Sequence, residues 1–212
     1  MAGVPQQVPE GLPDGVPEEL PEGRTEPDGS AVVRVLGYNI RSLKDDPAET
    51  ARVVRACRPD VLCVQEAPRF WRWARKSADF ASACEMLWVG GGRPASGPML
   101  LTSPRMRVEW TEDVLLPRTP GLHQRGFAVA GLRVGEGAAA PRLTALSCHL
   151  SLSPGERAEQ ARAALERVAG RGPCVVAGDI NEGPGGAAWS LLAGELDDAW
   201  GTAAWGGEWT SE

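Results

Sequence analysis

Four short apolar runs, each ending on polar side chains, constrain the fold of this chain more than any other feature. The runs cover residues 32–38, 60–64, 143–148 and 174–177. Short apolar runs bounded by polar residues are typical of buried strands. In open sheets flanked by helices, chemistry collects beyond the carboxyl ends of strands, because loops vary there while the strands hold them rigidly. The runs therefore predict one site at the strand ends.

The last run leads into the tetrapeptide Gly178-Asp179-Ile180-Asn181. Side chains two positions apart on a strand point to the same side, so Asp179 and Asn181 would face one place and hold a water molecule between them. Gly178 has no side chain, which allows backbone or substrate to approach closely. An aspartate before a glycine-rich loop is also typical of a simple turn.

The other three runs end on Asn39, on Gln65-Glu66 and on His149. A carboxylate among oxygen ligands suits Mg²⁺, and an imidazole suits a phosphate oxygen. The residues alone leave alternatives open: Glu66 is equally well a helix-capping acid, His149 a core histidine, and Asn39 a strand-end turn residue.

These motifs together resemble the endonuclease/exonuclease/phosphatase superfamily. The resemblance rests on Tyr38-Asn39-Ile40, Gln65-Glu66, Ser147–Ser151 and Gly178–Asn181, in this order and with these intervals. It implies an α/β fold, a four-layer α/β/β/α sandwich of two mainly antiparallel sheets (DNase I-like). It also implies a hydrolase that acts on phosphoesters with Mg²⁺, or alternatively Mn²⁺, as the cofactor.

The resemblance also implies a role for each site residue. Glu66 would bind the metal, and Asp179 would orient or deprotonate the attacking water. Asn181 would hold the phosphate or that water, and His149 would donate to a phosphate oxygen. Asn39 would hydrogen-bond Asp179 or a phosphate oxygen. The implied reaction is in-line attack by water without a covalent intermediate.

The chain departs from the family pattern at its C-terminal end, because family members close with an Asp-His pair. Its two histidines are His123 and His149, and neither follows an aspartate. We therefore expect the domain over residues 31–212 to lack its last strands and to hydrolyse phosphoesters slowly. The tryptophans of residues 200–209 support that expectation, since exposed rings would form an apolar patch. The alternative is a catalytically defective relative that binds phosphorylated ligands.

Charge favours some substrates over others. Residues 1–30 contain seven acids against the single base Arg24, so they account for the whole net charge of −6 and the remainder is neutral. A neutral body lacks the basic surface of a protein that grips long nucleic acid. A small phosphoester or lipid headgroup is therefore the favoured substrate, and nucleic acid is the alternative. A local basic rim would still steer an anion towards the protein; it is formed by Arg69, Arg72, Arg75 and Lys76.

Composition also predicts the setting of the protein. Five cysteines without a CxxC pair indicate free thiols and a cytoplasmic location, and no apolar run is long enough for a membrane span. We expect a monomer. Residues 1–30 carry a proline every four residues from Pro5 to Pro21, which predicts a disordered tail, either a solubilising leader or a partner-binding motif.

Periodicity and punctuation predict the remaining elements. We expect helices from Pro47 to Cys57 (capped by Asp45 or Asp46), from Pro68 through Phe80, from Ser153 to Ala169 and from Gly186 to Leu192. We expect strands at residues 86–89, 99–102, 107–116, 126–134 and 143–149. The aromatic stripe Phe70, Trp71, Trp73 and Phe80 favours a core or lid over a base-stacking platform. His123 and Arg125 favour a solvated loop over contact with the leaving group.

Overall fold

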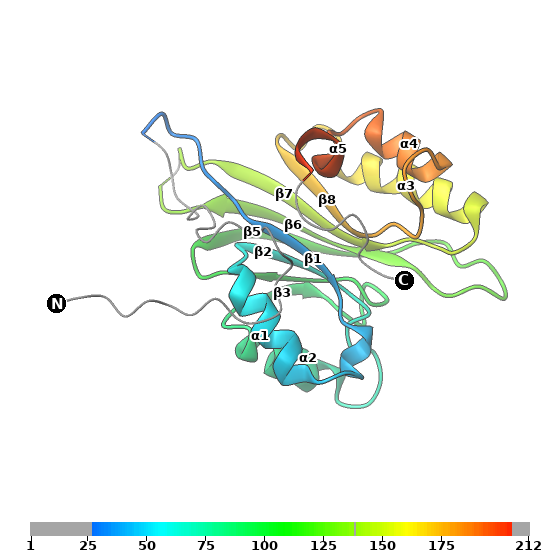
Figure 1. Cartoon of the computed structure of the whole chain (residues 1–212), viewed down its shortest axis with the longest axis horizontal. Helices are drawn as coiled ribbons and strands as arrows, with labels where there is room; N and C mark the ends of the chain where they lie inside the picture. Colours follow the sequence, from blue (N-terminus) through cyan, green and yellow to red (C-terminus); the bar gives the residue numbers. More distant parts are fainter. Residues whose placement is uncertain (1–26, 138, 205–212) are drawn as a thin grey trace.

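Two four-stranded sheets pack face to face between two layers of helices in the computed structural model, which describes residues 27–137 and 139–204 (Figure 1). The first sheet has the order β1 (Val35–Asn39), β2 (Val61–Gln65), β4 (Met99–Thr102) and β3 (Leu87–Gly91). The second has the order β5 (Met106–Leu115), β6 (Gly126–Val134), β7 (Arg142–His149) and β8 (Cys174–Asp179). The predicted four-layer α/β sandwich is confirmed.

Strand direction brings the predicted site residues to one end of the sandwich. β1 pairs with β2 and β7 pairs with β8 in parallel, while the other pairs are antiparallel. The registers place Asn39 opposite Gln65 and His149 opposite Asp179. Because β1 packs against β8 and β2 against β7, all four strands end at the same place.

The helices cover the two outer faces. α1 (Pro47–Cys57) and α2 (Trp73–Ala83) lie on the first sheet, whereas α3 (Pro154–Val168), α4 (Ala187–Ala193) and α5 (Ala199–Ala203) lie on the second (Figure 1). A 3₁₀ turn, η1 (Arg41–Leu43), follows β1. Separate apolar clusters fill the two helix–sheet interfaces, and a third fills the space between the sheets.

The helix starts agree with sequence in part. Asp46 caps α1 by accepting hydrogen bonds from the amides of Ala48 and Glu49, as predicted. Pro154 occupies the first turn of α3 and Ser153 is its N-cap residue, as the expected start at Ser153 requires, but the Ser153 side chain makes no capping hydrogen bond. In the turn that precedes α3, the Ser151 hydroxyl accepts a hydrogen bond from the Ser153 amide.

The predicted start of the second helix at Pro68 is wrong, because α2 begins at Trp73. The preceding segment is tied elsewhere: the Ala67 amide donates to the Gly97 carbonyl, and Arg69 donates to the Ser96 carbonyl. Phe70 and Trp71 therefore lie outside the helix and are 82% and 76% exposed. A core position for these two rings is ruled out.

The five cysteines are free, as expected from their spacing. Burial raises the pKa of Cys63 to about 12, so its thiol stays neutral and packs as an apolar group. Residues 1–26, which make up most of the predicted disordered tail, and the tryptophans at positions 205 and 209 lie outside the described residues. Within the described part of the chain, no helix is long and apolar enough to cross a membrane.

Candidate active site

A cavity of about 350 Å³ lies at the carboxyl ends of the central strands. Four of the five predicted site residues line it, namely Glu66, His149, Asp179 and Asn181. The fifth, Asn39, is joined to this set by hydrogen bonds. Residues that are as much as 142 positions apart in the sequence therefore meet at one place, because both sheets end there.

The Asn39 side chain links the two carboxylates. Its Nδ2 donates to Glu66 Oε1 at 3.1 Å and to Asp179 Oδ2 at 3.2 Å, while its Oδ1 accepts from the Arg41 amide. Both amide protons are used, so the side chain has one orientation that satisfies all three contacts. Asn39 thus holds two like charges near each other, and the expected hydrogen bond to Asp179 is present.

His149 stands beside Asp179. Its Nε2 lies 3.6 Å from Asp179 Oδ2, and its side chain is 12% exposed. Burial lowers the pKa of His149, and the nearby Arg125 guanidinium lowers it further, whereas Asp179 and Glu66 act in the opposite direction. The neutral imidazole is therefore favoured, and it still carries one N–H that can donate to a phosphate oxygen.

The backbone around Asp179 explains the unusual tetrapeptide. Gly178 has a φ of 153°, and a Cβ there would collide with the carbonyl oxygen of Cys148. β8 ends at Asp179, so Asn181 is not on the strand as predicted but adopts a left-handed conformation with φ 55°. Its Nδ2 donates to the Leu150 carbonyl, which fixes its side chain at the cavity.

Arg125 belongs to the site, although its sequence context favoured a solvated loop. It lines the cavity, and its buried Nε has no hydrogen-bond partner among the described residues. Burial lowers the pKa of its guanidinium, while the Asp179 carboxylate opposes that effect. An arginine facing a carboxylate-lined cavity can pair with an anionic phosphate. The only sequence signal was its position directly before β6.

Several further residues of the cavity were not predicted as site residues. Arg69 and Ser96 line it together, and so does the exposed His123. Arg69 was predicted only as part of a basic rim. The contact between residues 69 and 96 depends on how the two loops fold, so neither loop alone contains a signal for it.

Gln65 has a structural position. It is 2% exposed, and its Nε2 donates to the Cys63 carbonyl at 2.8 Å. The hydroxyl of Ser147 on β7 donates to the Val64 carbonyl of β2 at 3.0 Å. Buried polar groups that are satisfied in this way hold the two sheets in one relative position next to the site.

The donor set fits a hard divalent cation. Glu66 and Asp179 supply carboxylate oxygens at the cavity, and Mg²⁺ is commonly held by one or two carboxylates together with water and substrate phosphate. No group of three or more His, Cys, Asp and Glu residues suited to a metal occurs in residues 27–137 or 139–204. A metal here would therefore depend on Glu66, with most of its ligands coming from substrate and solvent.

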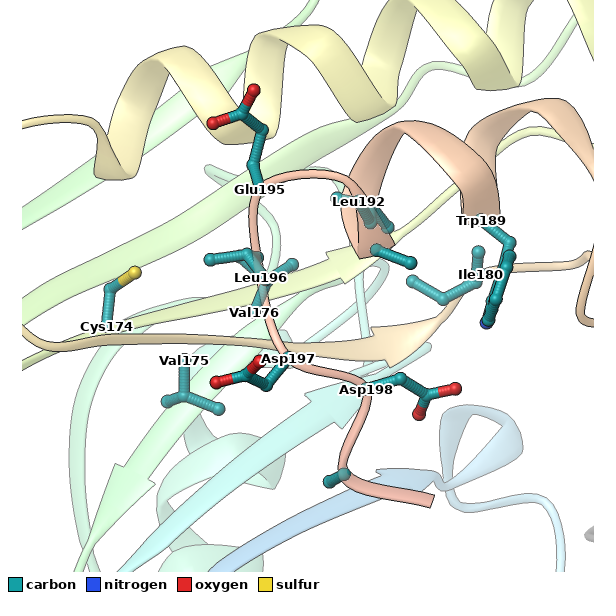
Figure 2. A pocket seen from close by; sticks show the side chains of 12 residues that line it. Cys174, Val175, Val176, Ile180, Trp189, Leu192, Glu195, Leu196, Asp197 and Asp198 are labelled. Atoms are coloured by element: carbon teal, nitrogen blue, oxygen red, sulfur yellow. The ribbon is translucent and has the colours of Figure 1, made fainter. Parts of the chain in front are cut away.

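A larger cavity of about 450 Å³ contains none of the predicted catalytic residues. It lies between β8 and the segment that follows α4 (Figure 2). Figure 2 shows the apolar side chains of Val176 on β8 and Leu192 on α4, and the carboxylates of Asp197 and Asp198 on the loop after α4. The residues of 27–137 and 139–204 that line this cavity include no arginine, lysine or histidine that would bind a phosphate.

Comparison with known protein families matches residues 36–211 to the Endonuclease/Exonuclease/phosphatase family. The chain belongs to this family. The match covers every motif on which the resemblance rests, so the predicted family is confirmed. No match was found among curated proteins.

Solved structures of family members share the fold. They include an endonuclease/exonuclease/phosphatase from Bacteroides vulgatus (18% identity, TM-score 0.64, 77% of this chain and 71% of that chain). A mannosyl-6-phosphatase from Bacteroides thetaiotaomicron has 15% identity and a TM-score of 0.62 over 77% and 71%. D. rerio TDP2 in complex with a single strand DNA product has 18% identity and a TM-score of 0.59 over 76% and 64%. The chain thus spans less than two thirds of the D. rerio protein.

Proposed function

We propose that this protein is a Mg²⁺-dependent phosphoester hydrolase. The observation that carries the proposal is the bridge from Asn39 to both Glu66 and Asp179, in a cavity that also contains His149 and Arg125. Carboxylates, an imidazole and a guanidinium at one cavity are the groups that phosphoryl transfer to water requires. Relatives of the same fold include a phosphatase and a protein solved with a DNA product, which fits this reaction class.

Each site residue has a role in the proposed reaction that follows from the chemistry of its side chain. Glu66 would hold the cation, which when bound neutralises charge on the phosphoryl oxygens. Asp179 would accept a hydrogen bond or a proton from the attacking water, and Asn181 would orient that water or the phosphate. His149 and Arg125 would donate to the phosphate oxygens as negative charge develops. Asn39 would keep the Asp179 carboxylate in place.

The test is hydrolysis of a bis-aryl phosphodiester with Mg²⁺ and with EDTA. We expect hydrolysis in the presence of Mg²⁺ and none in EDTA. The rate of hydrolysis should fall by about 10²-fold or more in Glu66→Gln and in Asp179→Asn. Asp79→Asn is the matched control, since Asp79 is an exposed carboxylate on α2 that pairs with Arg75 away from the cavity. Turnover that is insensitive to EDTA, or equal in all three variants, would contradict the proposal.

A second measurement does not depend on turnover. A ligand that binds only the folded state raises the melting temperature. We therefore expect Mg²⁺ to stabilise the wild-type protein and Asp79→Asn but not Glu66→Gln. Stabilisation by Mg²⁺ without hydrolysis of any phosphoester would instead favour the phospho-ligand-binding alternative.

A further inference from the structure

A groove of about 730 Å³ continues from the catalytic cavity across the segment that precedes α2. The groove and the cavity share Arg69, Ser96, His123 and Gln124 in their linings, so they form one continuous depression. Beyond the shared residues the groove is lined by the rings of Phe70 and Trp71 and by further arginines. A substrate that enters the catalytic cavity can therefore extend into it.

The lining of this groove is cationic. It contains Arg69, Arg72, Arg93 and Arg118, and no aspartate or glutamate from the described residues. None of these four arginines forms an ion pair with a carboxylate of the described residues, whereas Arg75 next to them pairs with Asp79. Four guanidiniums at one concave surface, without an ion-pair partner in the described part of the chain, create a positive potential that attracts a polyanion.

Two aromatic rings alternate with these charges. The Arg69 guanidinium lies 6.0 Å from the centre of the Phe70 ring, and that of Arg72 lies 5.0 Å from the Trp71 ring. Both rings are more than three quarters exposed, although rings of this size are normally buried. Trp73, two positions further on, packs edge to face with Trp88 instead. Among the aromatic rings that line the groove, Phe70 and Trp71 are therefore the ones whose faces are largely open to solvent.

We infer that this groove binds single-stranded nucleic acid, with bases stacked on Phe70 and Trp71 and phosphates paired with the arginines. Aromatic faces that accept bases, combined with a basic track for the backbone, are how proteins bind single strands without reading sequence. A small phosphoester would occupy only the catalytic cavity and would leave both rings exposed. A flat lipid surface would not reach into a concave lining.

This inference refines the substrate of the proposed hydrolase, and it rests on that function only for the cleavage step. Residues 31–212 have no net charge, which disfavours binding of long nucleic acid. A net charge is an average over the whole domain, whereas a short single strand needs only the few charges that it touches. Two members of the predicted rim, Arg69 and Arg72, line the groove, but Arg75 and Lys76 do not.

Binding of a short fluorescein-labelled oligothymidylate, followed by anisotropy in EDTA, tests the inference without turnover. We expect log K to fall with log salt with a slope of about −0.7 for each phosphate contacted. Trp71→Ala should weaken binding about tenfold through lost stacking, and Arg72→Ala should reduce the slope by about 0.7. Trp200→Ala and Arg75→Ala are the matched controls and should bind as the wild type does, because neither residue lines the groove.

The outcomes separate this inference from the proposed function. No binding of the oligonucleotide, or equal binding by Trp71→Ala and Trp200→Ala, would overturn the inference, even if the aryl phosphodiester is hydrolysed. Sedimentation with phosphatidylserine vesicles in place of oligonucleotide binding would overturn it in favour of a membrane. Groove-dependent binding without any Mg²⁺-dependent hydrolysis would support it and contradict the hydrolase.

Discussion

At the scale of single residues, Asn39 decides the geometry of the site. A carboxylate and an amide are nearly the same size, but only the amide can donate to two neighbouring acids. The Asn39 Nδ2 does so to Glu66 and Asp179, which otherwise would repel each other across the cavity. The site therefore depends on one hydrogen-bond donor as much as on the acids themselves.

We expect Asn39→Asp to lower kcat for the aryl phosphodiester by about 10²–10³-fold, the usual cost of losing a preorganised donor in an active site. The substitution replaces a donor with a third negative charge and changes the volume little. Steady-state kinetics, with circular dichroism to confirm folding, measure the effect. An Asn39→Asp enzyme with wild-type kcat would show that the bridge is not needed.

The lowered pKa of His149 predicts how the stability of the protein depends on pH. Burial and Arg125 lower its pKa in the folded protein, so the unfolded chain takes up a proton near pH 6.5 and the folded protein only at lower pH. The contribution of His149 to stability is thus present above pH 6.5 and is lost as the pH falls through its lowered folded-state pKa. Urea unfolding at pH 7 and at pH 5 gives the decrease in the free energy of unfolding between the two pH values. This decrease should be smaller in His149→Asn than in the wild type, and an equal decrease would count against a buried neutral imidazole.

At the scale of elements, one ion pair joins α3 to the start of α4. Arg157 on α3 donates to Glu182 Oε1 and, through Nη1, to the carbonyls of Ser151 and Leu152. Glu182 Oε2 accepts from two amides in the first turn of α4. These amide hydrogen bonds and the guanidinium hold the pKa of Glu182 below its usual range. Both loops that flank Asn181 are thereby fixed.

Glu182→Gln should loosen this junction without unfolding the sandwich, because a neutral amide accepts weaker hydrogen bonds than a carboxylate. We expect faster hydrogen exchange at the amides of Ala188 and Trp189, while exchange in β6 stays unchanged. Glu195→Gln is the control, since Glu195 lies in the loop after α4 and forms no ion pair with a described residue. Identical exchange in both variants would show that the ion pair does not hold α4.

At the scale of the whole molecule, the apolar layer between the sheets makes the domain one unit. Leu100 of β4 and Leu132 of β6 are each 1% exposed and belong to the same buried cluster. The catalytic residues come from both sheets, so the site exists only when this layer is intact. Folding and site assembly should therefore occur together.

We expect Leu100→Ala to lower the free energy of unfolding by about 2–5 kcal/mol, the usual cost of removing a buried leucine side chain. Leu87→Ala is the control at 52% exposure and should change stability by no more than about 0.5 kcal/mol. Urea unfolding monitored by fluorescence and by circular dichroism should give coincident transitions in both variants. Separate transitions would show that the two sheets unfold independently.

Local patterns in the sequence determined the elements. Strands β2, β4, β6 and β8 and helix α1 lie within one or two residues of their predicted positions, because alternation, caps and turn residues act over a few neighbouring positions. The second helix was placed too early because its start depends on contacts with the turn at residues 92–97, which the local sequence does not contain.

The sequence by itself also determined the family and the candidate residues, because the order and spacing of the four motifs can be read directly from it. Only the tertiary structure decided what surrounds them: the bridge through Asn39, the place of Arg125 in the cavity, and the exposed rings of Phe70 and Trp71 beside arginines that form no ion pair with a described residue. Whether a side chain is buried, paired or free depends on residues far away in the chain. Distances of that kind are set by how the two sheets pack, and no local pattern encodes them.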